Sequence, residues 1–292
     1  MFGARSRRTS FTCRQRNPHG VRIISPWVHY GYPVIKTLAS LSFFSILLAS
    51  SHPGRENAVN PHPARPVDRF AVRLNNDQPR TMQAAGPTLV IGFLGGLLRR
   101  GDPIRSECKL AEHLRADHPE GVHVETFENR HHRAAHKTIL RLLDTDHDGT
   151  LSNDEKRAAR IILYGHSWGG AAVVHLAHDL QQEGIPVLLT LQVDSVGQHD
   201  EVIPSNVQRA ANFFQPSGLV HGRPTIRAAD PSHTKIIGNY RMDYKNHSID
   251  CSDYPWYERA LARTHNAIAC DPSVWAHVEA LIREELPAHG QR

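Results

Sequence analysis

A serine lies between two glycines in the segment Gly165-His166-Ser167-Trp168-Gly169, directly after the apolar run of residues 160–164 and directly before a helical pattern. The order strand, G-x-S-x-G, helix suits a nucleophile, because the sharp turn raises the hydroxyl above the sheet in strained backbone geometry. Glycines at both flanks remove side chains that would collide with the strand and the helix. The alternative is a glycine-rich turn in which Ser167 is only a helix N-cap. The position of the motif favours a nucleophile.

A serine hydroxyl is a poor nucleophile at neutral pH, so it needs a base, a carboxylate that orients the base, and donors for the oxyanion. Asp194 follows the apolar run of residues 187–193, at the carboxyl edge of the predicted sheet and next to the nucleophile strand. Asp200 and Asp230 are the alternatives. Acids near strand ends also form turns and cap helices. Its position next to the nucleophile strand favours Asp194.

The base is expected downstream of the acid, in the chain order serine, aspartate, histidine. His265 comes just before the terminal amphipathic helix predicted over residues 272–285, and we expect it in a loop above the sheet. His247 is the next candidate, whereas His277 falls inside that helix. The other histidines weighed for this role are His199, His221 and His233.

Backbone donors for the oxyanion are expected from two places. One is the N–H of Trp168, which follows the nucleophile. The other is the N–H of Phe93 or Leu94, where the run of residues 88–93 enters the glycine-rich segment Leu94-Gly95-Gly96. An ordinary glycine turn is the alternative interpretation of that segment.

Residues 144–155 match the pattern D-x-D-x-D-G-x5-E at every required position. Oxygens at loop positions 1, 3, 5, 7, 9 and 12 would form the cage that calcium prefers, and Gly149 would permit the sharp bend. Ser152 and Glu155 also fit a helix capping box, which is the alternative. Clustered carboxylates repel one another without a cation, which favours a calcium ion. The predicted ligands are Asp144, Asp146, Asp148, Thr150, Ser152 and Glu155.

Short apolar runs alternate with amphipathic stretches along the chain. Strands are predicted over residues 67–74, 88–93, 122–127, 160–164 and 187–193, and helices over residues 104–117, 132–143, 170–183 and 272–285. Strand and helix in alternation predict an α/β fold with a mostly parallel sheet covered by helices on both faces. Such sheets place their functional residues at the carboxyl ends of the strands.

Together, the segments GHSWGG, GFLGG, VDSVG around Asp194 and His265 before DPSVW resemble the α/β-hydrolase superfamily, specifically exported bacterial esterase or lipase-like members, with an inserted EF-hand-like calcium loop. The resemblance covers about residues 86–287. It implies Ser167 as nucleophile, His265 as general base and then acid, and Asp194 as the orienting carboxylate. Many members carry the acid one strand later, where Asp230 would match.

The first 51 residues contain six arginines, Lys36 and no acidic residue, followed by the apolar run of residues 37–49. This pattern predicts a signal segment over residues 1–51 and therefore export. A proline-rich linker is expected over 52–66 and the hydrolase domain over 67–292. From residue 52 onward 27 basic residues face 29 acidic ones, so the domain lacks the basic character of a nucleic-acid-binding protein. We expect no permanent membrane span, because the apolar run is too short.

The four cysteines include Cys13 in the leader. In an exported protein Cys251 and Cys270 could close one disulfide, with Cys108 buried and free. Five aromatic residues could line an acyl pocket or pack in the core: Phe213, Phe214, Tyr254, Trp256 and Tyr257.

Three functions remain open from the sequence. The first is a secreted serine hydrolase that cleaves small-molecule or lipid carboxylic esters through an acyl-enzyme. The second uses the same triad for acyl transfer or lactone opening. The third is a calcium-binding extracellular module without catalysis.

Overall fold

The computed structural model describes residues 86–96, 98–118 and 120–287. The predicted signal segment, the linker and the strand expected over residues 67–74 lie outside the described residues. Within the described part of the chain, no helix is long and apolar enough to span a membrane.

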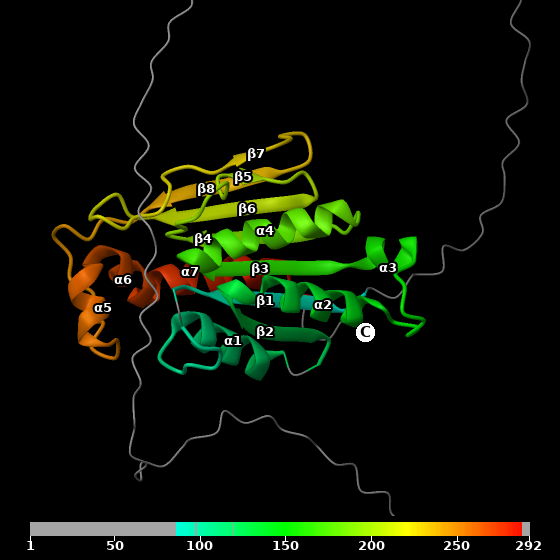
Figure 1. Ribbon diagram of the computed structural model, residues 1–292, viewed down its shortest axis with the longest axis horizontal. Helices are drawn as coiled ribbons and strands as arrows, with labels where there is room; N and C mark the ends of the chain where they lie inside the picture. Colours follow the sequence, from blue (N-terminus) through cyan, green and yellow to red (C-terminus); the bar gives the residue numbers. More distant parts are fainter. Residues whose placement is uncertain (1–85, 97, 119, 288–292) are drawn as a thin grey trace, which may run out of the picture. The chain divides into compact units, whose positions relative to one another are not determined.

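Within the described ranges, six parallel strands form the central sheet, in the order β2-β1-β3-β4-β6-β8 (Figure 1). The strands are β1 (Thr88–Leu94), β2 (Val122–Glu128), β3 (Arg160–His166), β4 (Val187–Val193), β6 (Val207–Phe214) and β8 (Lys235–Arg241). Two short strands, β5 (Val202–Ile203) and β7 (Arg227–Ala228), pair separately. All residues of β1 and β4 are buried, as expected for the interior of a sheet that is covered on both faces.

Helices cover both faces of this sheet (Figure 1). The buried side chains of α2 (His132–Leu143) and α4 (Trp168–Gln182) belong to one apolar core, and those of α1 (Ser106–Asp117) and α7 (Pro272–Glu285) belong to the other. The shorter helices are η1 (Asn129–His131), α3 (Asn153–Ala158), α5 (Trp256–Leu261) and α6 (Arg263–Cys270). The predicted α/β class, with a parallel sheet between helical layers, is confirmed.

One local prediction is wrong. His265 does not lie in a loop, because residues 263–270 form α6. This helix buries Ala267, Ile268 and Ala269, the first two of which pack into the core that α1 and α7 share. The apolar residues of this short segment therefore hold it as a helix against the sheet, and His265 projects from its first turn.

A disulfide joins Cys251 to Cys270, and Cys108 is free and buried, as the cysteine positions allow. The bond connects the segment before α5 to the last residue of α6. It therefore closes the α5–α6 pair into one covalent loop of the chain, and this loop carries His265.

Candidate active site

The turn between β3 and α4 holds Ser167 in a strained conformation, with φ 57° and ψ −126°. A Cβ on Gly165 would lie 2.5 Å from backbone atoms of Gly169, and a Cβ on Gly169 would lie 2.2 Å from the carbonyl oxygen of Phe93. Both flanking glycines are therefore required by close backbone approach. The turn has the backbone geometry that presents a serine above the sheet.

Ser167, His265 and Asp194 lie together at the carboxyl end of the sheet. The Nε2 atom of His265 is 2.9 Å from the Ser167 Oγ, and its Nδ1 is 2.6 Å from Oδ2 of Asp194. Because a carboxylate only accepts hydrogen bonds, Nδ1 carries the proton and Nε2 is free to accept the hydroxyl proton of the serine. All three side chains are buried. The structure brings together the three residues predicted as nucleophile, base and acid.

Two groups that the sequence analysis did not single out hold the Asp194 carboxylate. Gln215 donates its backbone N–H to Oδ1 and its side-chain amide to Oδ2, both at 3.1 Å. The backbone N–H of Gly222 donates to Oδ1 at 2.7 Å. These hydrogen bonds fix the carboxylate opposite His265. Gln215 directly follows β6, which the sequence analysis did not predict as a strand. Recognising that strand would have placed Gln215 at the carboxyl edge of the sheet, where functional residues are expected.

The alternative acids are engaged elsewhere. Asp200 is buried and accepts hydrogen bonds from the Ser195 hydroxyl, the Gly197 N–H and the Arg223 guanidinium, which anchors the loop after β4. Asp230 is half-exposed and accepts from Ser232 and the His233 ring in a turn.

The other candidate histidines do not meet Ser167. His233 contacts Asp230, His221 contacts the Gly222 carbonyl, and His247 lines a separate cavity beside Tyr244. His277 lies in α7 and packs against the rings of Phe213 and Tyr240.

The glycine-rich segment follows β1, and the oxyanion role of the Phe93 or Leu94 N–H stays a prediction. Phe93 and Leu94 belong to β1 and pair with β2, and both are fully buried. Gly95 and Gly96 instead line the cavity that contains Ser167. A Cβ on Gly95 would lie 2.9 Å from the Cβ of Ser167, so this backbone is immediately beside Ser167. Trp168 is the first residue of α4, where the backbone N–H has no acceptor within the helix.

A cavity of about 560 Å³ opens onto Ser167 and His265. Tyr254 and Tyr257 line it together with Leu98. The other three aromatic residues considered for an acyl pocket do not line it: Phe213 and Phe214 are buried in the core, and Trp256 is exposed.

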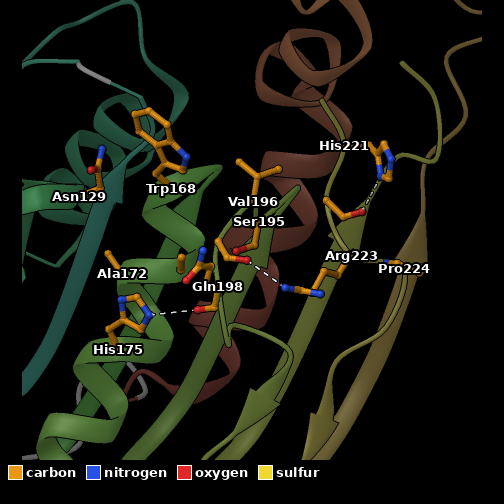
Figure 2. Close-up of a pocket in the computed structure, with 13 residues that line it drawn as sticks. Asn129, Trp168, Ala172, His175, Ser195, Val196, Gln198, His221, Arg223 and Pro224 are labelled. Carbon is orange, nitrogen blue, oxygen red and sulfur yellow. Dashed lines mark hydrogen bonds between the residues drawn. The ribbon is translucent and has the colours of Figure 1, made fainter. Parts of the chain in front are cut away.

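Trp168 also lines a second, more open cavity of about 720 Å³, shown in Figure 2. Its wall includes polar groups from three segments. The His175 ring contacts the Gln198 carbonyl, and the Arg223 guanidinium donates to the Gly197 carbonyl. The half-exposed Trp168 side chain therefore lines both this polar cavity and the cavity that contains Ser167.

Two buried ionisable groups lie beside the triad and were missed from the sequence. Glu107 on α1 lines the catalytic cavity, and burial raises the pKa of its carboxyl to about 7. The ring of His166 lies beside that of His265 in a tilted arrangement, with 4.7 Å between ring centroids. Burial and the neighbouring His265 lower the pKa of His166 well below its usual range. His166 therefore places a neutral ring beside the ring of His265.

Residues 144–155 form a loop between α2 and α3. Single carboxylate oxygens of Asp144, Asp146 and Asp148 lie within 4.8 Å of one another. Calcium ligands at 2.3–2.6 Å from the ion are separated by distances of this order. The Oδ1 atom of Asp144 is buried and has no hydrogen-bond partner among the described residues. The carboxylate cluster therefore fits a cation.

Glu155 takes part in a helix capping box, which was the alternative to calcium binding. Its carboxylate accepts from the backbone and hydroxyl of Ser152, and the Ser152 hydroxyl accepts from the Glu155 N–H, which is a capping box for α3. Its second oxygen accepts from Thr145. The structure does not place Glu155 with the three aspartates.

No protein-family model matches this chain, and no curated protein matches it. Among solved structures, a cutinase-like protein from Cryptococcus sp. shares 14% identity over 69% of this chain and 96% of its own, with a TM-score of 0.38. The RedJ thioesterase of the prodiginine pathway in Streptomyces coelicolor shares 13% over 70% and 88%, with a TM-score of 0.36. A YdeN-like hydrolase from Pectobacterium atrosepticum shares 12% over 68% and 94%, with a TM-score of 0.33. At such TM-scores these likenesses decide neither family nor activity.

Proposed function

We propose that this chain is a serine hydrolase with an α/β-hydrolase fold, which cleaves carboxylic esters through an acyl-enzyme. The observation that carries the proposal is the hydrogen-bonded series from the Ser167 hydroxyl to His265 and on to Asp194, at 2.9 and 2.6 Å. The strained φ of Ser167 supports it, because such strain is typical of a nucleophile at a strand-to-helix turn.

In the first step, Ser167 Oγ forms a bond to the ester carbonyl carbon and its proton passes to Nε2 of His265. The carbonyl π electrons become a lone pair on the oxyanion, which we expect the backbone N–H groups of Trp168 and Gly95 to stabilise. Asp194 keeps the Nδ1–H in place and stabilises the imidazolium. His265 then returns its proton to the departing alkoxide, and a water molecule repeats the sequence to release the acid.

The shape of the site indicates the class of ester. Leu98, Tyr254 and Tyr257 give the catalytic cavity an apolar wall suited to an acyl group. The second cavity, which Trp168 also lines, is more polar and more open. We therefore propose an ester with an apolar acyl part and a polar alcohol part.

Fluorophosphonate labelling tests the nucleophile directly. Only an activated serine reacts, so wild type is expected to be labelled and Ser167→Ala is not, while the exposed control Ser232→Ala is labelled like wild type. A panel of p-nitrophenyl esters of graded acyl length then measures substrate preference. Labelling that persists in Ser167→Ala, or wild type that is neither labelled nor active, would contradict the proposal.

The remaining alternatives separate in the same assays. An acyltransferase or lactonase would be labelled as well, but added alcohol would yield a new ester, or a lactone would outcompete open-chain esters. A non-catalytic module would not be labelled.

We further propose that the loop of residues 144–155 binds one calcium ion. The clustered aspartates and the unpartnered Oδ1 of Asp144 support this. Glu155 would have to leave its contacts with Ser152 and Thr145 to serve as the twelfth-position ligand. A bound ion would offset the repulsion among the aspartates and hold the loop that leads through α3 to β3. Terbium luminescence, competed by calcium, would measure binding.

We also propose that the protein is exported. The basic and apolar leader of residues 1–51 supports this, and so does the Cys251–Cys270 disulfide, since such bonds persist in oxidising compartments. N-terminal sequencing of the secreted protein should give a start near residues 50–52. An uncleaved protein retained in the reducing cytoplasm would contradict export.

A further inference from the structure

The catalytic cavity contains a buried carboxyl that the triad does not use. Glu107, in the first turn of α1, is 1% exposed and lines the cavity with Ser167 and His265. Its Oε1 accepts a hydrogen bond from the backbone N–H of Gly95 at 3.4 Å, and lies 4.0 Å from Nδ1 of His166. Burial makes this carboxyl costly to ionise, although the backbone N–H groups of Glu107 itself and of Gly95 favour its charged form.

Gly95 connects this carboxyl to the chemistry. Its backbone packs directly against Ser167 and follows the end of β1, so its N–H is a candidate oxyanion donor. The bond to Glu107 is long and therefore weak, which leaves the N–H able to turn to a stronger acceptor. A carboxylate next to the same N–H would repel the negative charge that develops on the oxyanion. A neutral carboxylic acid would not, and its O–H could donate a further hydrogen bond.

The surroundings favour the neutral acid. Arg105 is the nearby cation, but Asp102 and both oxygens of Glu258 already neutralise it. Burial outweighs the remaining attraction and raises the carboxyl pKa to about 7. The ionisable groups that face Glu107 come from α1 and its preceding loop, from β3, and from the segment of α5 and α6: Asp102, Arg105, Cys108, Tyr164, His166, Tyr254, Glu258 and His265.

We propose that Glu107 acts at the oxyanion site of Ser167 as a neutral carboxylic acid, and that its ionisation suppresses acylation. This inference rests on the proposed function. Glu107 keeps its proton during acylation, so the bonds formed and broken are those described above. The Ser167 proton goes to His265, and the carbonyl electron pair becomes the oxyanion lone pair. The role requires only that a hydrogen bond and the absence of a negative charge favour the transition state.

The pH profile of kcat/KM tests the proposal. Ionisation of Glu107 should lower wild-type kcat/KM about tenfold per pH unit above pH 7. Glu107→Gln stays neutral at every pH and keeps a donor, so it should lose this alkaline decline. Glu112→Gln, an exposed change on the same helix, should keep the wild-type profile. An alkaline limb with the same midpoint in Glu107→Gln would overturn the proposal.

A second measurement does not depend on the variant folding. Carbon-13 NMR of wild type with labelled glutamate carboxyls should show one carboxyl that titrates near pH 7. The midpoint of this titration should equal the midpoint of the alkaline decline in kcat/KM. A kinetic midpoint that matches no carboxyl would count against Glu107. Wild type that resists fluorophosphonate and hydrolyses no ester at any pH would instead refute the proposed function itself, so the two failures are distinct.

Discussion

Arg105 and Glu258, which are 153 positions apart in the chain, form a two-pronged ion pair that joins the start of α1 to α5. Their hydrogen bonds measure 2.8 and 2.9 Å, and the Arg105 side chain is 4% exposed. The guanidinium also lies 4.4 Å from the centroid of the Tyr254 ring. Because Tyr254 and Tyr257 line the cavity that contains Ser167, this pair holds one wall of the proposed substrate site.

Removing either partner of this pair should destabilise the fold. Arg105→Met leaves the Glu258 carboxylate without its cation, and Glu258→Leu leaves the buried guanidinium with Asp102 alone, so each should lower the free energy of unfolding by about 3 kcal/mol. The double variant should lose less than the sum. KM for esters should rise in all three variants while labelling of Ser167 persists. Urea unfolding of the four proteins gives the coupling energy, and strict additivity would show that the ion pair is not coupled.

Two matched substitutions test which aspartate orients His265. Asp194→Asn should reduce kcat by about 10⁴-fold, because the amide presents a donor to Nδ1 and favours the wrong histidine tautomer. Asp230→Asn should leave kcat unchanged, since Asp230 sits in a half-exposed turn with Ser232 and His233. Steady-state kinetics on one ester is sufficient. The reverse pattern would assign the acid to Asp230, the position that the superfamily resemblance offered as an alternative.

The parts of this molecule that follow from local sequence were predictable. The fully buried strands β1 and β4 appear as mostly apolar runs with at most two polar residues each, and the G-x-S-x-G turn marks the end of β3. Strand β6 was missed because polar residues interrupt its apolar pattern, including Asn212, which is buried and donates to the Arg223 carbonyl. Edge strand β8 was missed because most of its side chains are only partly buried or exposed.

The remaining site residues depend on contacts between distant segments. Gln215 and Gly222 reach Asp194 only because β6 lies next to β4. Glu107 looks like an ordinary acidic residue in the first turn of a helix, which the helix dipole favours. Its burial arises from the packing of α1 against the glycine segment after β1, and no local pattern encodes that contact.

Stability should depend on pH through Glu107. The folded carboxyl has a pKa of about 7, raised by burial from 4.5, so between these values the folded state holds a proton that the unfolded state has lost. The free energy of unfolding should therefore fall as pH rises from 4.5 to 7, by up to about 3 kcal/mol. Glu107→Gln should remove this slope. Urea unfolding at pH 4.5 and pH 8 and constant ionic strength measures it, and a pH-independent difference between wild type and variant would contradict the expectation.

Calcium removal should destabilise the fold through the loop of residues 144–155. At a calcium concentration a hundredfold above Kd, binding would contribute about 2.7 kcal/mol, so EGTA should lower the melting temperature by about 5–10 °C. Asp146→Asn, which removes one clustered carboxylate, should show a smaller EGTA effect. Asp154→Asn is the matched control, because Asp154 lies at a non-ligand position and pairs with Arg157. Differential scanning calorimetry with and without EGTA decides the matter, and a wild-type melting temperature indifferent to EGTA would refute a stabilising ion.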